Sequence, residues 1–159
     1  MSIERFFELC SEKAFFEWWQ MLLIGLFFGV CNSGIFLAEW FSRVGITKEC
    51  GYPKRNAKNI KKIFQQYTVI DRFLLFKLVK NAQSKNPMLY ITLICHYISF
   101  LGYLTSMAGF IFAMITLADG WAMMLMICGK FFTMILTVLI EFIPHLIWVP
   151  SERKRYGIR

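Results

Sequence analysis

The sequence lacks the short motifs that mark the common nucleotide-binding and hydrolytic enzymes. It contains no G-x-x-x-x-G-K-S/T, G-x-G-x-x-G, G-x-S-x-G or H-E-x-x-H pattern. Histidine is scarce, because His96 and His145 are the only two and both lie in long apolar runs. These absences favour a non-enzymatic protein. An intramembrane enzyme that uses Glu141 and one of the histidines as an acid/base pair is a third hypothesis.

Cysteine usage gives no support to a disulfide framework or a zinc site. The five cysteines are odd in number, form no C-x-x-C pair, and three of them lie in apolar runs: Cys10, Cys31, Cys50, Cys95 and Cys128. We interpret them as small core residues and expect no cofactor and no bound metal. The first residues, MSIERFFELCSEK, carry mixed charge, which is not typical of a cleavable signal peptide.

Long apolar runs are abundant. The chain is 57% hydrophobic and 18% aromatic, which exceeds the content of soluble domains. About 20 apolar residues cross the hydrocarbon core of a bilayer. We therefore predict an all-α integral membrane protein with transmembrane helices at 20–41, 88–117 and 121–149. A tight turn at 118–120 makes the last two an antiparallel hairpin. The V-C-N-S-G stretch at 30–34 leaves open a re-entrant hairpin in place of the first span.

The remaining segments are polar or amphipathic. Residues 1–19 have helical apolar spacing, which fits either an interfacial helix or an extension of the first span. Residues 42–87 begin with a turn-rich linker containing Gly51 and Pro53. A basic amphipathic helix is expected from Asn56 to Gln83. Residues 150–159 form a basic tail.

Charge predicts the topology. The 42–87 segment carries eleven basic residues against two acidic ones, and the tail carries four against one. The N-terminal arm has four glutamates against two basic residues. Because basic loops stay on the cytoplasmic side, we predict an inner or plasma membrane protein with its N-terminus outside and its C-terminus cytoplasmic.

Small residues recur at helical spacing on two of the spans. They allow close helix packing, and the candidate contact positions are Gly25, Gly29, Ser33, Gly102 and Gly109. Together with the polar faces described next, they predict that identical chains pack around a shared axis as a homo-oligomer.

Polar side chains share one face on each of the last two spans. The second span contributes His96, Ser99, Tyr103 and Ser106, and the third contributes Lys130, Thr133, Thr137, Glu141 and His145. Lipid cannot satisfy these groups, so they should face protein or water. Three interpretations remain open. A histidine pairs with Glu141 and locks the hairpin, the two faces line an ion path, or Glu141, His145 and His96 hold a metal.

The basic helix predicts a contact surface. Its candidate contact residues are Lys58, Lys61, Lys62, Arg72, Lys77 and Lys80. Anionic lipid headgroups are one partner, and a soluble cytoplasmic protein is another. Nucleic acid is not expected, because no recognition module is present.

These patterns predict a non-enzymatic, oligomeric membrane component with a polar-lined core, whose basic helix docks or anchors a soluble partner at the membrane. The alternative is an ion-conducting channel or pore, including an effector that depolarises the membrane in toxin or phage-defence settings. That alternative follows from architecture alone.

Overall fold

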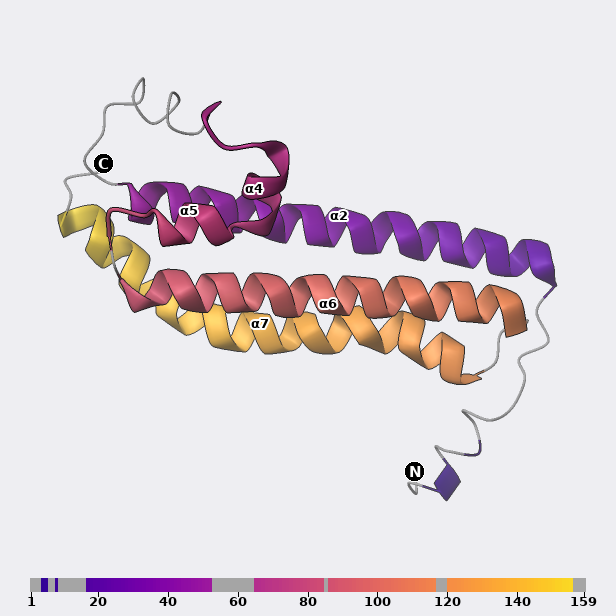
Figure 1. Cartoon of the computed structure of the whole chain (residues 1–159). Helices are drawn as coiled ribbons and strands as arrows, with labels where there is room; N and C mark the ends of the chain where they lie inside the picture. Colours follow the sequence, from indigo (N-terminus) through magenta and orange to yellow (C-terminus); the bar gives the residue numbers. More distant parts are fainter. Residues whose placement is uncertain are drawn as a thin grey trace. The chain divides into compact units, whose positions relative to one another are not determined.

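The computed structural model describes Glu4, Arg5, Glu8 and residues 17–52, 65–84, 86–116 and 120–155, with backbone alone at 142–144, 152, 153 and 155. In this part of the chain the elements are all helices (Figure 1): α2 (Trp18–Gly51), α4 (Val69–Leu74), α5 (Phe76–Lys80), α6 (Pro87–Thr116) and α7 (Gly120–Arg155). The predicted N-terminal helix, the 118–120 turn and Lys58, Lys61 and Lys62 fall largely or wholly outside the described residues.

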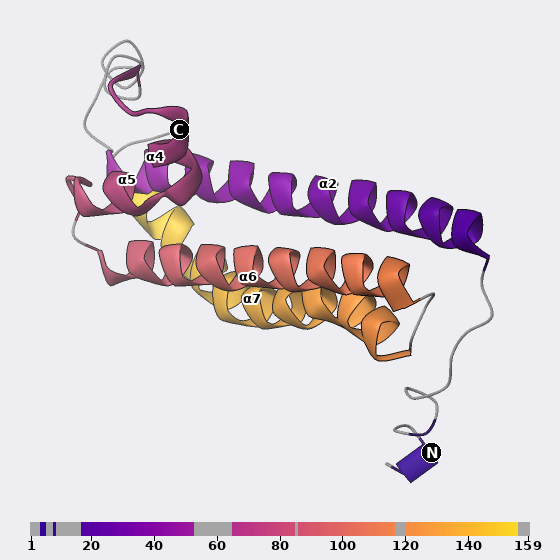
Figure 2. The ribbon, with the colours of Figure 1, turned by 45° about the vertical axis from the view of Figure 1, so that its right-hand side comes forward.

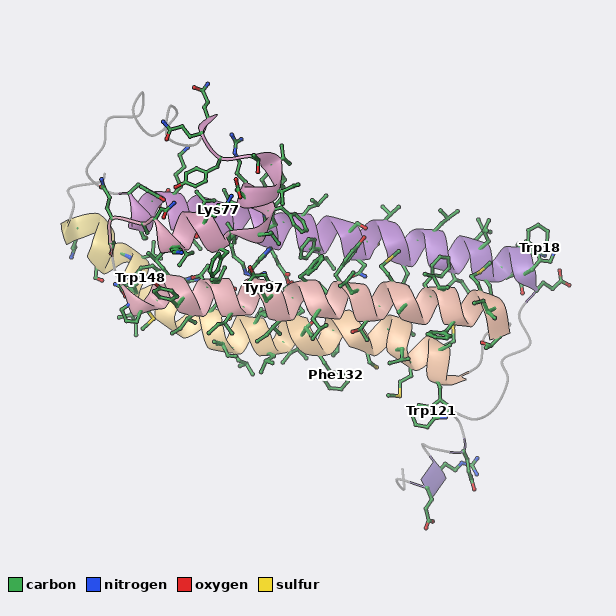
Figure 3. All side chains as sticks on the ribbon, in the orientation of Figure 1. Trp18, Lys77, Tyr97, Trp121, Phe132 and Trp148 are labelled. Carbon is green, nitrogen blue, oxygen red and sulfur yellow. The ribbon has the colours of Figure 1, made fainter. Side chains whose placement is uncertain are left out.

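Three helices are long and apolar enough to cross a membrane. They are α2 with 34 residues, α6 with 30, and the first 22 residues of α7, Gly120–Glu141. Large apolar side chains are exposed along them, and Figure 3 shows Phe132 pointing away from its helix. Such surfaces suit acyl chains better than water. The predicted all-helical fold with three membrane-length helices is thus confirmed, and it supports a multi-pass membrane protein.

The helix α2 excludes one alternative and corrects one expectation. It is continuous through residues 30–34, so the first apolar run forms one helix and no re-entrant hairpin. It also continues to Gly51, where a turn-rich linker was expected. Thr47 and Cys50 are buried in this extension. Their packing outweighs the weak helix propensity of Gly45, which is about 1 kcal/mol worse than alanine. The helix α7 likewise runs into the predicted tail, as far as Arg155.

In residues 65–84, the described part of the expected basic helix, there are two short helices where a continuous one was expected. The helix breaks at Leu75, whose φ of 55° lies in the left-handed region. Neither glycine nor proline marks this position. Leu75 is fully buried, as is Leu78. Burial of these side chains therefore offsets the strain of a left-handed leucine, which is about 1–2 kcal/mol. We call residues 65–84, which contain α4 and α5, the arm.

The contacts divide the chain into two compact units. Unit 1 comprises Met1–Phe36 and Ile98–Leu136, and unit 2 comprises Leu37–Tyr97 and Thr137–Arg159. Each unit has its own buried cluster. The cluster of unit 1 is formed by Met21, Ala113 and Ala122. The cluster of unit 2 joins the arm to the long helices through Cys50, Tyr52, Leu75, Leu78, Val79, Leu89, Leu93 and Trp148.

In unit 1, α6 and α7 lie side by side and antiparallel (Figures 1 and 2). Glycines permit the close approach. A Cβ atom at Gly109 would overlap the backbone of Leu125 and Met126, and one at Gly102 would overlap the side chain of Thr133. The Ser106 hydroxyl donates to the Met126 carbonyl at 2.6 Å. The hairpin is therefore held by backbone proximity and by a hydrogen bond between its helices.

Candidate functional site

In unit 1 the polar residues gather around Lys130. The Lys130 side chain comes from α7 and is 5% exposed. Its ammonium donates to the Ser99 hydroxyl of α6 at 2.5 Å and lies 5.5 Å from the ring centroid of Phe36 on α2. Cations are attracted to aromatic faces, and more strongly where water is excluded. Three helices therefore share the environment of one buried cation.

The other hydroxyl groups of this face also bond within unit 1. The hydroxyls of Ser33 and Tyr103 are 3.3 Å apart and join α2 to α6. The Thr133 hydroxyl donates to carbonyls of its own helix, at Gly129 and Lys130. Among the small residues predicted for packing, Gly25 lies against the Phe110 ring, whereas a Cβ atom at Gly29 would meet no described atom within 4 Å.

In unit 2 the central feature is a buried ion pair. Arg43 of α2 donates from Nε to Oε1 of Glu141 and from Nη2 to Oε2, both at 3.0 Å. A second carboxylate, from Glu39, lies 3.5 Å from Nη1. The exposed fractions of the Arg43 and Glu141 side chains are 3% and 13%. This two-bond fork is the strongest geometry for such a pair.

Sequence reasoning gave Glu141 a different partner. One of the three interpretations paired Glu141 with His96 or His145, whereas the described contact of Glu141 is with Arg43. Arg43 was counted as one of the loop charges because it follows the predicted end of the span. The sequence did contain a signal that Arg43 belongs to the first helix. Glu39 and Arg43 are four residues apart at the end of an apolar run, which is the spacing of an ion pair on one helix face.

His96 belongs to a second arrangement, which holds the end of α4. Its Nε2 donates to the Phe73 carbonyl at 2.8 Å, so that nitrogen carries the proton. The Trp40 indole donates to the Arg72 carbonyl at 3.1 Å, and the Tyr97 hydroxyl donates to the Leu74 carbonyl at 3.1 Å.

These carbonyls belong to the last three residues of α4. The final carbonyls of a helix have no partner within it, and a break without a cap leaves them unsatisfied. Here two long helices supply a side-chain donor for each one. The arm is consequently held by hydrogen bonds as well as by its buried leucines. We call Trp40, His96 and Tyr97 the cap residues.

His145 and Thr137 complete the polar set of unit 2. Nε2 of His145 is 3.5 Å from the Thr92 hydroxyl, and its ring stacks on Trp148 with centroids 6.4 Å apart. Thr137 is 1% exposed. Glu141 and His145 also line a cavity of about 340 Å³. Within the described part of the chain, no three histidine, cysteine or acidic residues are placed to hold a metal. His96, Glu141 and His145 therefore do not form the metal site that one interpretation required.

The start of α4 carries a local charge pair. Thr68 and Asp71 form a capping box, in which each side chain accepts from the other residue's backbone amide. The Lys77 ammonium lies 2.6 Å from Asp71. Its hydrogen bond, followed by that from the Thr68 hydroxyl, holds the pKa of the Asp71 carboxyl below its ordinary value. Lys77 and Lys80 are exposed on the arm, whereas Arg72 is half-buried.

The fold and these contacts place the chain in the class of all-helical proteins with several membrane-length helices. Comparison with known proteins adds no relative: no family model, curated protein or solved structure matches the chain.

Proposed function

We propose that this protein is a non-enzymatic membrane component that holds the arm at the cytoplasmic face of an inner or plasma membrane, where the arm docks a soluble protein. The observation that carries the proposal is the two-sided character of the arm. Its inner side is buried and its carbonyls are capped by Trp40, His96 and Tyr97. A segment fixed in this way presents its other side in a constant arrangement, which lowers the entropic cost of binding.

The outer side of the arm combines apolar and basic groups. Val69 and Ile70 are 74% and 69% exposed, and Phe76 is exposed beside Lys77. An apolar centre with a charged rim is typical of protein interfaces. The strong positive charge of residues 42–87 indicates a partner with an acidic surface.

Co-purification tests the docking proposal. The full-length protein in nanodiscs of neutral lipid is incubated with soluble extract, and bound proteins are identified by mass spectrometry. The double change Lys77→Glu and Lys80→Glu should remove a specific acidic protein that the wild type retains. Lys154→Glu, an exposed charge reversal on α7, is the matched control and should retain it.

Two results would overturn the docking proposal. In one, the double variant retains the same proteins as the wild type. In the other, a parallel preparation in nanodiscs that contain anionic lipid shows no acidic protein on the wild type, while the double variant loses bound anionic lipid in native mass spectrometry, which would make the arm a headgroup-binding surface. The triple change Lys58→Glu, Lys61→Glu and Lys62→Glu extends the same comparison to the start of the basic segment.

The proposal includes a homo-oligomer. Its support is the exposed apolar surface of the membrane-length helices and the open side of Gly29, which leaves room for close approach of another helix. Native mass spectrometry of the detergent-extracted protein should give a multiple of the 18.7 kDa chain mass. A monomer mass under gentle extraction would contradict this part of the proposal.

An ion-conducting pore is the second candidate. The cavity lined by Glu141 and His145 favours it, because acidic and imidazole groups select and relay cations. The pore predicts ion flux in proteoliposomes that is abolished by Glu141→Gln. Flux with the same rate in the variant, or none in the wild type, would exclude conduction through this cavity.

A further inference from the structure

A cavity in unit 1 lies between α2 and α7. Its volume is about 230 Å³, and its wall is mainly apolar, with Phe28 and Ile35 from α2 and Ile127 from α7. A dry apolar cavity of about 150 Å³ is large enough to hold a benzene molecule. This cavity can therefore admit part of an apolar molecule. It belongs to neither the cap residues nor the Arg43 ion pair.

Two polar residues are among those that line the cavity, and the first is Asn32. Asn32 is 4% exposed, and neither its amide nitrogen nor its amide oxygen has a hydrogen-bond partner among the described residues. Buried amides are normally bonded, and lipid offers no substitute for water at this depth. A rotamer change that turned the amide into the cavity would break no hydrogen bond to a described residue. After that change, the Asn32 amide can bond a ligand in the cavity.

The second polar residue is Lys130. It lines the same cavity from α7, and its ammonium is held beside Ser99 and the Phe36 ring. An ammonium and an amide are both N–H donors, so together they suit an acceptor that takes two donors at once. A carboxylate is such an acceptor, and its hydrogen bonds to charged donors are the stronger kind.

The remaining part of the ligand must match the apolar wall of the cavity and the membrane-length helices that form it. An apolar wall on a membrane-length helix selects a molecule that is soluble in the bilayer. We infer that the cavity between α2 and α7 binds the carboxyl end of a free long-chain fatty acid, with Asn32 and Lys130 as its polar contacts. The amide suits either protonation state, because a carboxylate accepts from Nδ2 and a carboxylic acid donates to Oδ1.

Photolabelling tests this assignment. The full-length protein in nanodiscs is exposed to palmitic acid that carries a diazirine near the carboxyl group, and adducts are mapped by mass spectrometry. We expect saturable labelling of peptides that contain residues 27–35 and 127–134. Unlabelled palmitic acid should compete for this labelling, whereas hexadecanol and hexadecane should compete far less.

Three variants sharpen the test. Asn32→Leu keeps the side-chain volume, removes an unsatisfied amide, and should lower saturable labelling by about tenfold or more, the loss expected for a hydrogen bond to a charged group. Ile127→Trp fills the cavity and should abolish the saturable labelling. Ile115→Trp, a matched change at an exposed position of α6, should leave it unchanged. Circular dichroism and the elution volume on size exclusion confirm that each variant folds.

Several outcomes would overturn the inference. Labelling that rises linearly with probe, or spreads evenly over the apolar surface, would show partition into lipid without a site. Labelling that is unchanged in both Asn32→Leu and Ile127→Trp would place the fatty acid elsewhere. Competition by hexadecanol as strong as by palmitic acid would remove the role given to the carboxyl group.

Discussion

Arg43 and Glu141 show how this chain accommodates charge among apolar helices. Their hydrogen bonds join α2 to α7 within unit 2, and Glu39 adds a second carboxylate near the guanidinium. Removing one member of a buried pair leaves an uncompensated charge, which typically costs about 3–5 kcal/mol. Replacing both members by apolar side chains removes that penalty. The pair is therefore best tested by a double-mutant cycle.

We expect Arg43→Met to destabilise the protein by about 3–5 kcal/mol, because two carboxylates lose the guanidinium. Glu141→Met should cost less, because Glu39 still lies near Arg43, and the double variant should lose less than the sum of the two single changes. Denaturant unfolding in bicelles measures the three free energies. Single changes that cost under about 1 kcal/mol, or a double variant that loses the sum of both, would show that the two side chains are not coupled.

Asp71 provides a pH-dependent contact outside the membrane-length helices. Because the Lys77 hydrogen bond lowers the pKa of Asp71 on folding, the contact contributes stability that is fully present above the ordinary pKa of an aspartate. That contribution is lost as the pH falls through the lower folded pKa. An NMR titration of the Asp71 carboxyl carbon should therefore give a midpoint below 3.8, the ordinary value. In Lys77→Met the midpoint should move upward, and an unchanged midpoint would rule out the pair as its cause.

Residue partners were the hardest feature to predict from the sequence. Helical periodicity grouped Lys130 with Thr133 and Ser99 with Tyr103 on shared faces, but it carries no information on which faces meet. Assigning Arg43 to the loop removed it from the search for a partner to Glu141. A charged residue just beyond a predicted span is worth including in such searches, because span boundaries are uncertain by several residues.

At the scale of elements, α6 and α7 depend on glycine where their backbones approach. A Cβ atom at Gly109 would overlap the α7 backbone, which cannot move as a side chain does. Gly109→Ala should therefore destabilise the protein by about 1–3 kcal/mol. Gly34→Ala is the control, because its Cβ atom would meet no described atom within 4 Å. It should be neutral or stabilising by up to about 1 kcal/mol through helix propensity. Thermal unfolding of both variants measures the two changes in stability, which should differ in sign or size. Equal changes would contradict the close backbone packing at Gly109.

The cap residues should govern the local stability of α4. Tyr97→Phe removes one donor and keeps the ring, so the local free energy of opening should fall by about 0.5–1.5 kcal/mol. Hydrogen exchange at the amides of residues 72–74 measures this directly, and exchange should accelerate about two- to tenfold. Tyr90 is an exposed residue of α6, the helix that also carries Tyr97. The change Tyr90→Phe should leave the exchange rates of these amides unchanged. Equal exchange in wild type and Tyr97→Phe would show that the cap does not stabilise α4.

The long helices could be predicted because apolar runs of 20 or more residues have few alternatives. The break at Leu75 could not, since leucine is a helix former and the break arises from its burial against residues distant in sequence. Donors such as Trp40 and Tyr97 carry no sequence signal for a cap, because their acceptors lie 23 or more residues away. Local patterns thus find the elements, and tertiary contacts decide where the elements end.

At the scale of the whole molecule, the two units carry different parts of the proposed function. Unit 1 holds the glycine-packed hairpin, the buried Lys130 and the cavity beside Asn32. Unit 2 holds the ion pair, the cap residues and the arm. Trp18 and Trp121 are both exposed at the same end of unit 1 (Figure 3), as expected for side chains at a membrane interface.

The central claim is that unit 2 holds the arm in one fixed arrangement. Pulsed electron paramagnetic resonance measures this most directly, with spin labels at Ile70 on the arm and Ile94 on α6, both exposed positions. Labels introduced as unnatural amino acids leave the native cysteines intact. In nanodiscs we predict a single narrow distance distribution that broadens when Trp40 and Tyr97 are both changed to phenylalanine. A broad distribution in the wild-type protein, spread over tens of ångströms, would contradict the account.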